Sequence, residues 1–463
     1  MYAKQFSFLH FAIEHWQNFL RNWPAISQPI GLLAIGIILW VLGRILMPDY
    51  VSITSVLTRM FYLFVGAQIC GIVLRIVRWP EMLGMLGFGV LYANIGLANF
   101  DGFNEFEIFF RDVALVNIML LAGMSIDLKA LVHTIFPVIR LSVLPTIGEV
   151  FIIAAFARYV LLMPFIWSFL LGLVLAAFSD IDIVLWLRVE KLGLYKGIHT
   201  IIIAMTSIND VVSIFFFNVV LGMIFSTDSL SIRLLQGPIG IAMGIVYGFV
   251  YGLGISKVIP SEASTYANGI RFSLMVLGGL LSVLGSRAIG FPSAGALGCV
   301  VLACTCGRSW QKPKHQKHNH ILEQLNLLWK FVKPISFALI GKEVILAKLD
   351  ATLIGYGVAI VIVGCCIRLL LTYAVLYGAD LHWKERIFIT MCSLPKAIVQ
   401  AALAPVALDL VRKNNLNEYH HLANIILIVA VLAIMITAPL GTILMVKFAP
   451  KLLQKSQATP STI

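Results

Sequence analysis

The chain has 463 residues, of which 60% are hydrophobic and only 12% are charged. That composition excludes an ordinary water-soluble protein, and no stretch of the chain is long and polar enough to form a separate soluble domain. The formal net charge of +12 does not indicate nucleic-acid binding, because basic residues beside membrane segments mark the side of the membrane on which a loop lies.

Apolar stretches recur along almost the whole chain, and we count about fourteen of them. Each is about twenty residues long, which allows a helix to cross about 30 Å of hydrocarbon. Only helices and closed barrels cross a bilayer, and these stretches are too long and continuous for barrel strands. The sequence therefore predicts an all-α polytopic membrane protein with about fourteen transmembrane helices. The predicted segments begin near Pro29, Ile53, Met82, Asp112, Ile135, Ile166, Gly197, Gly237, Ile270, Phe291, His320, Thr352, Arg386 and Leu422.

Basic residues determine the predicted topology. An even number of spans puts both termini on one side, and that side receives most of the Lys and Arg residues, so we expect both termini in the cytoplasm. Residues 1–29 form a predicted cytoplasmic N-terminal segment, residues 30–450 a transmembrane domain, and residues 451–463 a cytoplasmic tail. The plasma membrane is the expected location rather than an organelle membrane.

Two predicted spans, about seven segments apart, are interrupted midway by small and charged residues. The first break contains Ser179, Asp180 and Asp182, and the second runs from Ser393 to Ala397 with Lys396 inside it. An odd number of spans per repeat inverts the second copy, and paired breaks in two inverted halves indicate a transporter's binding site. We therefore expect inverted repeats with two broken helices that cross.

The segment from Gly197 to Phe225 carries a carboxylate, Asp210, close to its centre. An aspartate at that depth costs roughly 2.5–3.5 kcal/mol, and intramembrane acids usually mark ion or proton pathways. Thr206 and Ser213 lie four residues before and three residues after Asp210, so their hydroxyls share its helix face. This oxygen set suits a small cation such as Na⁺, with Asp210 as the metal ligand. The alternative is a polar helix contact that is satisfied internally.

Several charged residues are expected to compensate one another in the core. Asp180 or Asp182 in the first break and Lys396 in the second would lie near half-helix ends of opposite partial charge. A compatible alternative is an Asp182–Lys396 ion pair that only holds the core together. Glu149 and Arg368 occupy matching spans of the two repeats, and neither charge tolerates membrane depth alone, so we predict a structural ion pair between them.

Five stretches of the sequence carry family-like motifs: Ile340–Val344, Leu394–Ala402, Val406–Asp409, Ile436–Gly441 and Phe291–Gly295. They resemble the cation/proton antiporter superfamily, and within it the animal NHA-type sodium/proton antiporters. The resemblance extends over nearly the whole chain from about Ile30. It implies NhaA-like inverted repeats and a homodimer, in which a core domain around 135–226 and 352–448 moves as an elevator against a dimerisation domain formed by the remainder.

The resemblance also implies roles for individual residues. Asp210 would bind a cation and a proton alternately, in a site shared with Asn209, Thr206, Ser179 and Asp180. NHA-type antiporters usually carry two adjacent aspartates where this chain has Asn209-Asp210, a form that resembles the electroneutral exchangers of the superfamily. The usual Ser-Pro of the first break is replaced by Ser179-Asp180, which is similar to the bacterial NhaA-type antiporters.

We therefore expect an electroneutral Na⁺ (or Li⁺)/H⁺ antiporter that works by alternating access, is not an enzyme and uses no cofactor besides the transported ions. Its expected partners are a second copy of the chain, membrane lipids, monovalent cations and protons, and no nucleic acid. A potassium/proton exchanger or an organic-anion symporter on the same fold is one alternative. A non-transporting membrane scaffold, which would show no counterflow, is another.

Overall fold

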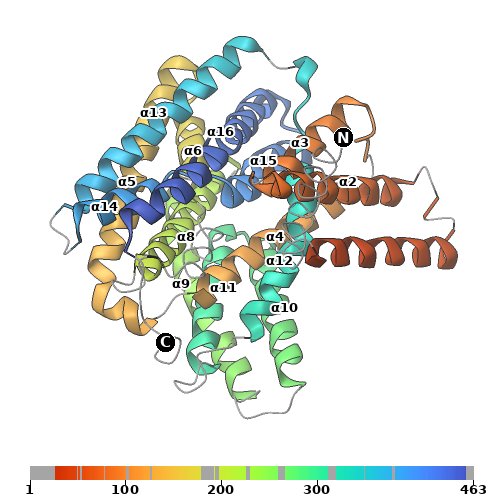
Figure 1. The fold of residues 1–463 in the computed structure, drawn as a ribbon, viewed down its shortest axis with the longest axis horizontal. Coiled ribbons are helices and arrows are strands. Elements are labelled where there is room, and N and C mark those ends of the chain that lie inside the picture. The colour runs from red at the N-terminus through yellow and green to blue at the C-terminus, as the bar shows by residue number, and fades with distance from the viewer. Residues whose placement is uncertain are drawn as a thin grey trace, which may run out of the picture. The chain divides into compact units, whose positions relative to one another are not determined.

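The computed structural model describes residues 27–48, 51–52, 55–77, 79–100, 104–125, 128–178, 192, 198–225, 230–258, 266–310, 320–348, 350–377 and 381–454. These residues are almost entirely helical, which confirms the all-α prediction (Figure 1). The helices are Ser27–Leu46, α2 (Val56–Ile76), α3 (Glu81–Asn94), α4 (Asn104–Ser125), α5 (Leu128–Val160), α6 (Phe165–Ala176), α8 (Ile198–Phe225), α9 (Leu230–Val258), α10 (Ala267–Ala288), α11 (Pro292–Trp310), α12 (His320–Gly341), α13 (Ala351–Val375), α14 (Trp383–Cys392), α15 (Ile398–Lys413) and α16 (His420–Leu452). Two short 3₁₀ helices cover Leu346–Lys348 and Asn417–Tyr419.

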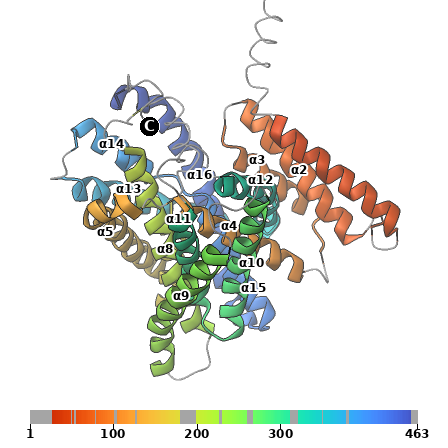
Figure 2. The ribbon, with the colours of Figure 1, turned by 90° about the horizontal axis from the view of Figure 1, so that it is seen from below.

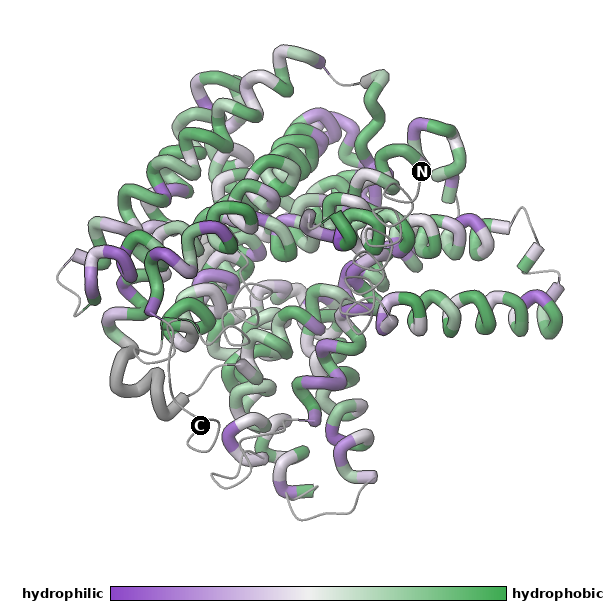
Figure 3. The backbone as a smooth tube through the Cα atoms, viewed as in Figure 1, coloured by the Kyte–Doolittle hydropathy of each residue, from purple (hydrophilic) through white to green (hydrophobic). Residues whose placement is uncertain are grey.

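Each of the predicted apolar segments coincides with one of these helices or, in the segment that begins near Arg386, with the pair α14 and α15. Within the described residues, nine helices are long and apolar enough to cross a membrane. Figure 3 shows hydrophobic residues along most of the length of these helices. The chain is thus an integral, multi-pass membrane protein, while the exact number of spans stays a prediction.

The chain divides into two compact units, residues 1–104 with 333–343 and residues 105–332 with 344–463. In the first unit, α2 packs against α3, and the buried ammonium of Lys333 lies 2.5 Å from Glu81 Oε1. Glu81 Oε2 also lies 2.6 Å from Arg75 Nη2. These units are defined by contacts and not by motion, so the predicted core and dimerisation domains stay predictions.

In the second unit, α5 packs against α6, α8 and α13, and α16 packs against α13, α14 and α15. Another group of helices has α11 packed against both α9 and α10 (Figure 1 and Figure 2). The α9–α11 contact depends on small residues, because a Cβ on Gly248 would lie 2.6 Å from the carbonyl oxygen of Gly298. Such close backbone approach is common between membrane helices.

The second predicted break occurs where the sequence places it, and α6 ends shortly before the position of the first. Helix α6 ends at Ala176, Ala177 is extended with φ −70° and ψ 149°, and the described chain stops at Phe178. The residues of the first break itself, Ser179, Asp180 and Asp182, lie outside the described residues. The second break is described in full and separates α14 from α15 through the non-helical residues 393–397. The site is built around these two helix ends.

Candidate functional site

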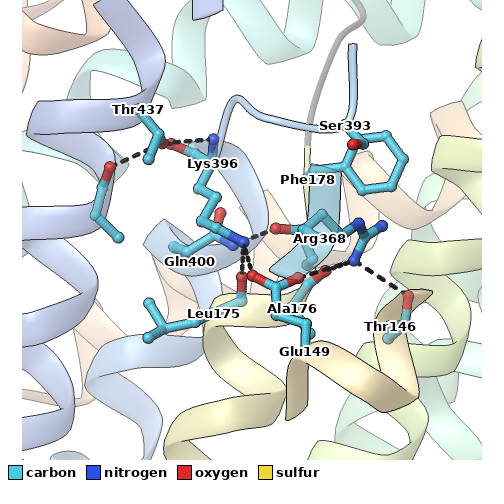
Figure 4. A network of polar contacts seen from close by, with 12 residues as sticks. Thr146, Glu149, Leu175, Ala176, Phe178, Arg368, Ser393, Lys396, Gln400 and Thr437 are labelled. Atoms are coloured by element: carbon cyan, nitrogen blue, oxygen red, sulfur yellow. Dashed lines mark hydrogen bonds and ion pairs between the residues drawn. The ribbon is translucent and has the colours of Figure 1, made fainter. Parts of the chain in front are cut away.

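The C-terminal end of α6 is buried, and the carbonyl groups of its last turn have no partner within the helix. Two cations from the second half of the chain approach them (Figure 4). Arg368 Nη1 on α13 donates to the Ala176 oxygen at 2.8 Å, and Lys396 Nζ in the second break donates to the Leu175 oxygen. A helix C-terminus carries negative partial charge, so cations stabilise it.

A neutral side chain completes this cap. Gln400, in the first turn of α15, donates from Nε2 to the carbonyl oxygens of Val174 at 3.1 Å and Ala177 at 2.5 Å. The last carbonyls of α6 are therefore satisfied by three side chains that all come from α13, the second break and α15. This contact joins the two broken helices directly, and unsatisfied carbonyls at membrane depth would be costly.

Glu149 on α5 accepts from both cations. Its Oε2 lies 3.0 Å from Arg368 Nη1 and its Oε1 lies 2.5 Å from Lys396 Nζ. Glu149 is 0% exposed, and Arg368 and Lys396 are each 1% exposed. The Arg368 guanidinium also lies over the Phe178 ring, 4.6 Å from its centroid. Charges this deeply buried are tolerated only when they are paired and hydrogen-bonded.

The structure therefore brings Glu149 and Arg368 together, as the matching spans led us to expect. Lys396, which we expected to compensate Asp180 or Asp182, contacts Glu149 and the Leu175 carbonyl in the described part of the chain. Asp180 and Asp182 lie outside that part, so their compensating role stays a prediction.

Asn209 on α8 connects this charged cluster to the helix that carries Asp210. Its Nδ2 donates to Thr146 Oγ1 at 2.5 Å and to the Ala176 oxygen at 3.3 Å. Its Oδ1 accepts from the backbone N–H of Phe178 at 3.2 Å. Thr146 also accepts from Arg368 Nη1 at 3.2 Å, so one hydroxyl joins Asn209 to the guanidinium. Both amide hydrogens of Asn209 are thus used within the protein, and only a lone pair of Oδ1 is left for an ion.

Asp210 is the next residue on α8 and has a different environment. It is 4% exposed, and its Oδ1 has no hydrogen-bond partner among the described residues. The hydroxyls of Thr206 and Ser213 are also buried, and in the described structure neither has a hydrogen-bond partner. Helical spacing puts all three oxygens on one face of α8. Buried oxygens without partners are rare, and each requires an explanation such as an ion or water that binds there.

Sequence reasoning missed Thr146, Gln400 and the contact between Lys396 and Glu149. A signal existed for the first two residues. Thr146 precedes Glu149 by three residues, which puts both side chains on the same face of α5. Gln400 follows Lys396 by four residues, inside an otherwise apolar stretch. No pattern in the sequence indicated which carboxylate would reach Lys396.

Comparisons with known proteins support a common origin with ion exchangers. Residues 60–447 match the family described as "Sodium/hydrogen exchanger, transmembrane". Sodium/hydrogen exchanger 9B2 of Homo sapiens is 34% identical over 412 residues, which cover 87% of this chain and 76% of that protein. Sodium/hydrogen exchanger 9B1 of Homo sapiens is 32% identical over 409 residues, which cover 86% and 78%. These matches confirm the resemblance inferred from the sequence motifs.

A solved structure shares the fold. The sodium proton antiporter MjNhaP1 from Methanocaldococcus jannaschii superposes with a TM-score of 0.72 over 86% of this chain and 98% of its own. The sequence identity is 18%, so this likeness concerns the fold alone.

Proposed function

The chain belongs to the sodium/hydrogen exchanger family, and we propose that it exchanges one Na⁺ or Li⁺ for one proton at Asp210 by alternating access. The family is one of transporters and not of enzymes. One observation carries the proposal: the unpartnered carboxylate oxygen of Asp210 shares a buried helix face with the unpartnered hydroxyls of Thr206 and Ser213. A carboxylate with neutral oxygens is a suitable ligand set for a small hard cation.

A single carboxylate in this position makes the two ions compete. Ionised Asp210 can hold a cation, whereas protonated Asp210 has lost the charge that would attract one. Binding of the proton and binding of the cation at Asp210 therefore exclude each other. That exclusion is the chemical requirement of an antiporter.

The pairing of the charges in the cluster supports one-for-one coupling. Glu149 is paired with Arg368 and Lys396, whereas Asp210 keeps a carboxylate oxygen without a partner in the described structure. The site gains one positive charge when either a proton or Na⁺ binds to Asp210. Asn209 cannot titrate. Both loaded forms therefore carry the same charge, and an exchange of one for the other moves no net charge.

The experiment that tests this proposal uses proteoliposomes with an enclosed pH-sensitive dye. Addition of Na⁺ or Li⁺ should drive proton movement by the wild-type protein, and Asp210→Asn should reduce it to the level of empty vesicles. Asp350→Asn is a matched control, because Asp350 is exposed and caps the first turn of α13. Normal exchange by Asp210→Asn would contradict the proposal, and a response to K⁺ alone would favour the potassium/proton exchanger.

A potassium gradient with valinomycin tests the coupling ratio. The rate and end-point of exchange should not follow the imposed potential if one proton moves per cation. A rate that follows the potential would contradict one-for-one coupling. Asp180, outside the described residues, would then be the candidate for a second titrating group, and Asp180→Asn should remove the voltage dependence.

We extend the proposal to the assembly: a homodimer whose mobile core comprises residues around 135–226 and 352–448. Glu149, Asp210, Arg368 and Lys396 all fall within these ranges, which supports a rigid carrier of the site. Chemical cross-linking in native membranes should trap a dimer. Accessibility labelling of the two termini should place both in the cytoplasm of cells, with the protein at the plasma membrane.

A further inference from the structure

One peptide unit at the end of α6 is held from both sides. Its carbonyl, that of Ala177, accepts from Gln400 Nε2 at 2.5 Å, and its N–H, that of Phe178, donates to Asn209 Oδ1 at 3.2 Å. A peptide unit is planar and rigid, so fixing both of its polar ends fixes its orientation. The two holding groups are side-chain amides from different repeats, one on α15 and one on α8.

The orientation of the Gln400 amide is determined by its neighbours. Its end group faces two carbonyl oxygens, those of Val174 and Ala177, which can only accept hydrogen bonds, so the NH₂ group must point toward them. The Gln400 side chain is 0% exposed, and its Oε1 has no hydrogen-bond partner within the described part of the chain. An unsatisfied buried acceptor is unfavourable for stability. The contact is thus directional. The unsatisfied Oε1 lowers the stability of the fold, a cost that an apolar residue at this position would avoid.

The held peptide is bonded to the residue that precedes the proposed ion ligand. Asn209 directly precedes Asp210 on α8, and Asn209 also accepts the Phe178 N–H. Rotation of the peptide would exchange its carbonyl for its N–H and so reverse its dipole beside Asn209. The preferred orientation thus affects the electrostatic environment in which Asp210 binds an ion. It does so without adding a formal charge, unlike Lys396 and Arg368.

We propose that Gln400 is a positioning residue: together with Asn209 it clamps the Ala177–Phe178 peptide, and this clamp raises the affinity of the Asp210 site for its cation. The inference rests on the proposed cation/proton exchange at Asp210. Gln400 does not need to touch the ion, because it acts through the orientation of the Ala177–Phe178 peptide.

The test is substitution of Gln400 by Met, which has a similar length but no donor. Gln68→Met is the matched control, because Gln68 is also buried, donates from Nε2 to the Pro29 oxygen at 3.4 Å, and has an Oε1 without a partner in the described structure. Gln68 lies in the first unit, outside the site. Gln400→Asn, which keeps the amide but is shorter, provides a milder variant if Gln400→Met does not fold.

Two measured quantities distinguish a positioning role of Gln400 from a role in packing alone. The first is the apparent KM for Na⁺, which is measured in proteoliposomes together with the maximal rate. The second is the Na⁺ concentration that gives half-maximal thermal stabilisation of the purified protein in detergent. We expect Gln400→Met to raise both the KM and this concentration about tenfold, equivalent to about 1.4 kcal/mol, with a smaller rise for Gln400→Asn. Gln68→Met should lower the ion-free melting temperature and leave both quantities unchanged.

Asp210→Asn separates the two proposals. If it abolishes the stabilisation by Na⁺ while folded Gln400 variants bind Na⁺ within twofold of the wild type, the clamp is wrong and the exchange site stands. If Asp210→Asn is still stabilised by Na⁺ like the wild type, the proposed site itself is wrong, and the clamp inference is overturned with it.

Discussion

The end of α6 and the second break, which follows α14, both lie in the second unit, and their backbone polar groups are satisfied in different ways. At the end of α6, buried carbonyls are satisfied by Arg368, Lys396 and Gln400, which are distant in sequence. At the second break, the N–H groups of Ser393 and Leu394 bond back to the last turn of α14. Lys396 N donates to Thr437 Oγ1 at 2.9 Å, and Pro395 has no N–H to satisfy.

This difference between the two helix ends shows where a broken membrane helix needs a charged side chain. Both ends are C-terminal and carry negative partial charge, but the turn after α14 supplies N–H donors to its last carbonyls, whereas side chains distant in sequence, two of them cationic, bond to the last carbonyls of α6. The second break needs only a local turn and one hydroxyl for the groups described above. Substitutions at the α6 cap should therefore affect both stability and transport, whereas substitutions at the second break should affect mainly stability.

The largest effect is expected from Glu149→Gln, which leaves Arg368 and Lys396 without their shared carboxylate. Removal of one partner from a buried ion pair typically costs about 3–5 kcal/mol. The melting temperature in detergent should fall sharply, and a double-mutant cycle with Arg368→Gln should show strong coupling. Additive losses in that cycle would contradict the ion pair.

A smaller effect is expected from Lys396→Met, because the Glu149–Arg368 contact survives it. The variant loses the charge-assisted hydrogen bonds to Glu149 and to the Leu175 carbonyl, but it removes the ammonium itself and leaves Glu149 paired with Arg368, so no buried charge is left unpaired. Measured by denaturant or thermal unfolding, the loss should be less than that of Glu149→Gln. A greater loss would mean that Lys396, and not Glu149, is the centre of the network.

The smallest effect is expected from Thr437→Val at the second break. This change leaves the buried Lys396 N–H without its acceptor, at a cost of about 1–3 kcal/mol. Thr437→Ser keeps the hydroxyl and should behave as the wild type. The apparent KM for Na⁺ should stay unchanged in both variants. An increase of that KM in Thr437→Val alone would remove the distinction between the two helix ends.

Much of the architecture could be predicted because apolar length and intramembrane charge are local signals. The segment that begins near Arg386 was expected to be interrupted, and Ser393–Ala397 is the described break. Glu149 and Arg368 could be paired from their matching spans. The partner of Lys396 could not be predicted, because Glu149 lies 247 residues away and the direction of a long side chain depends on the packing around it. Gln400 stands out as a polar residue in an apolar stretch, but nothing in the sequence indicates that it contacts the carbonyls of α6.

The cap on α6 also has a consequence for biosynthesis. Arg368 and Lys396 follow the carbonyls that they cap by 192 and 221 residues. At about 5–20 residues per second, a ribosome needs roughly ten to forty seconds to add 192 residues. During that interval the nascent chain has inserted α6 without its cations. The first half of the protein therefore cannot reach its final packing until the second half leaves the ribosome, so assembly of the ion site is one of the last steps of maturation.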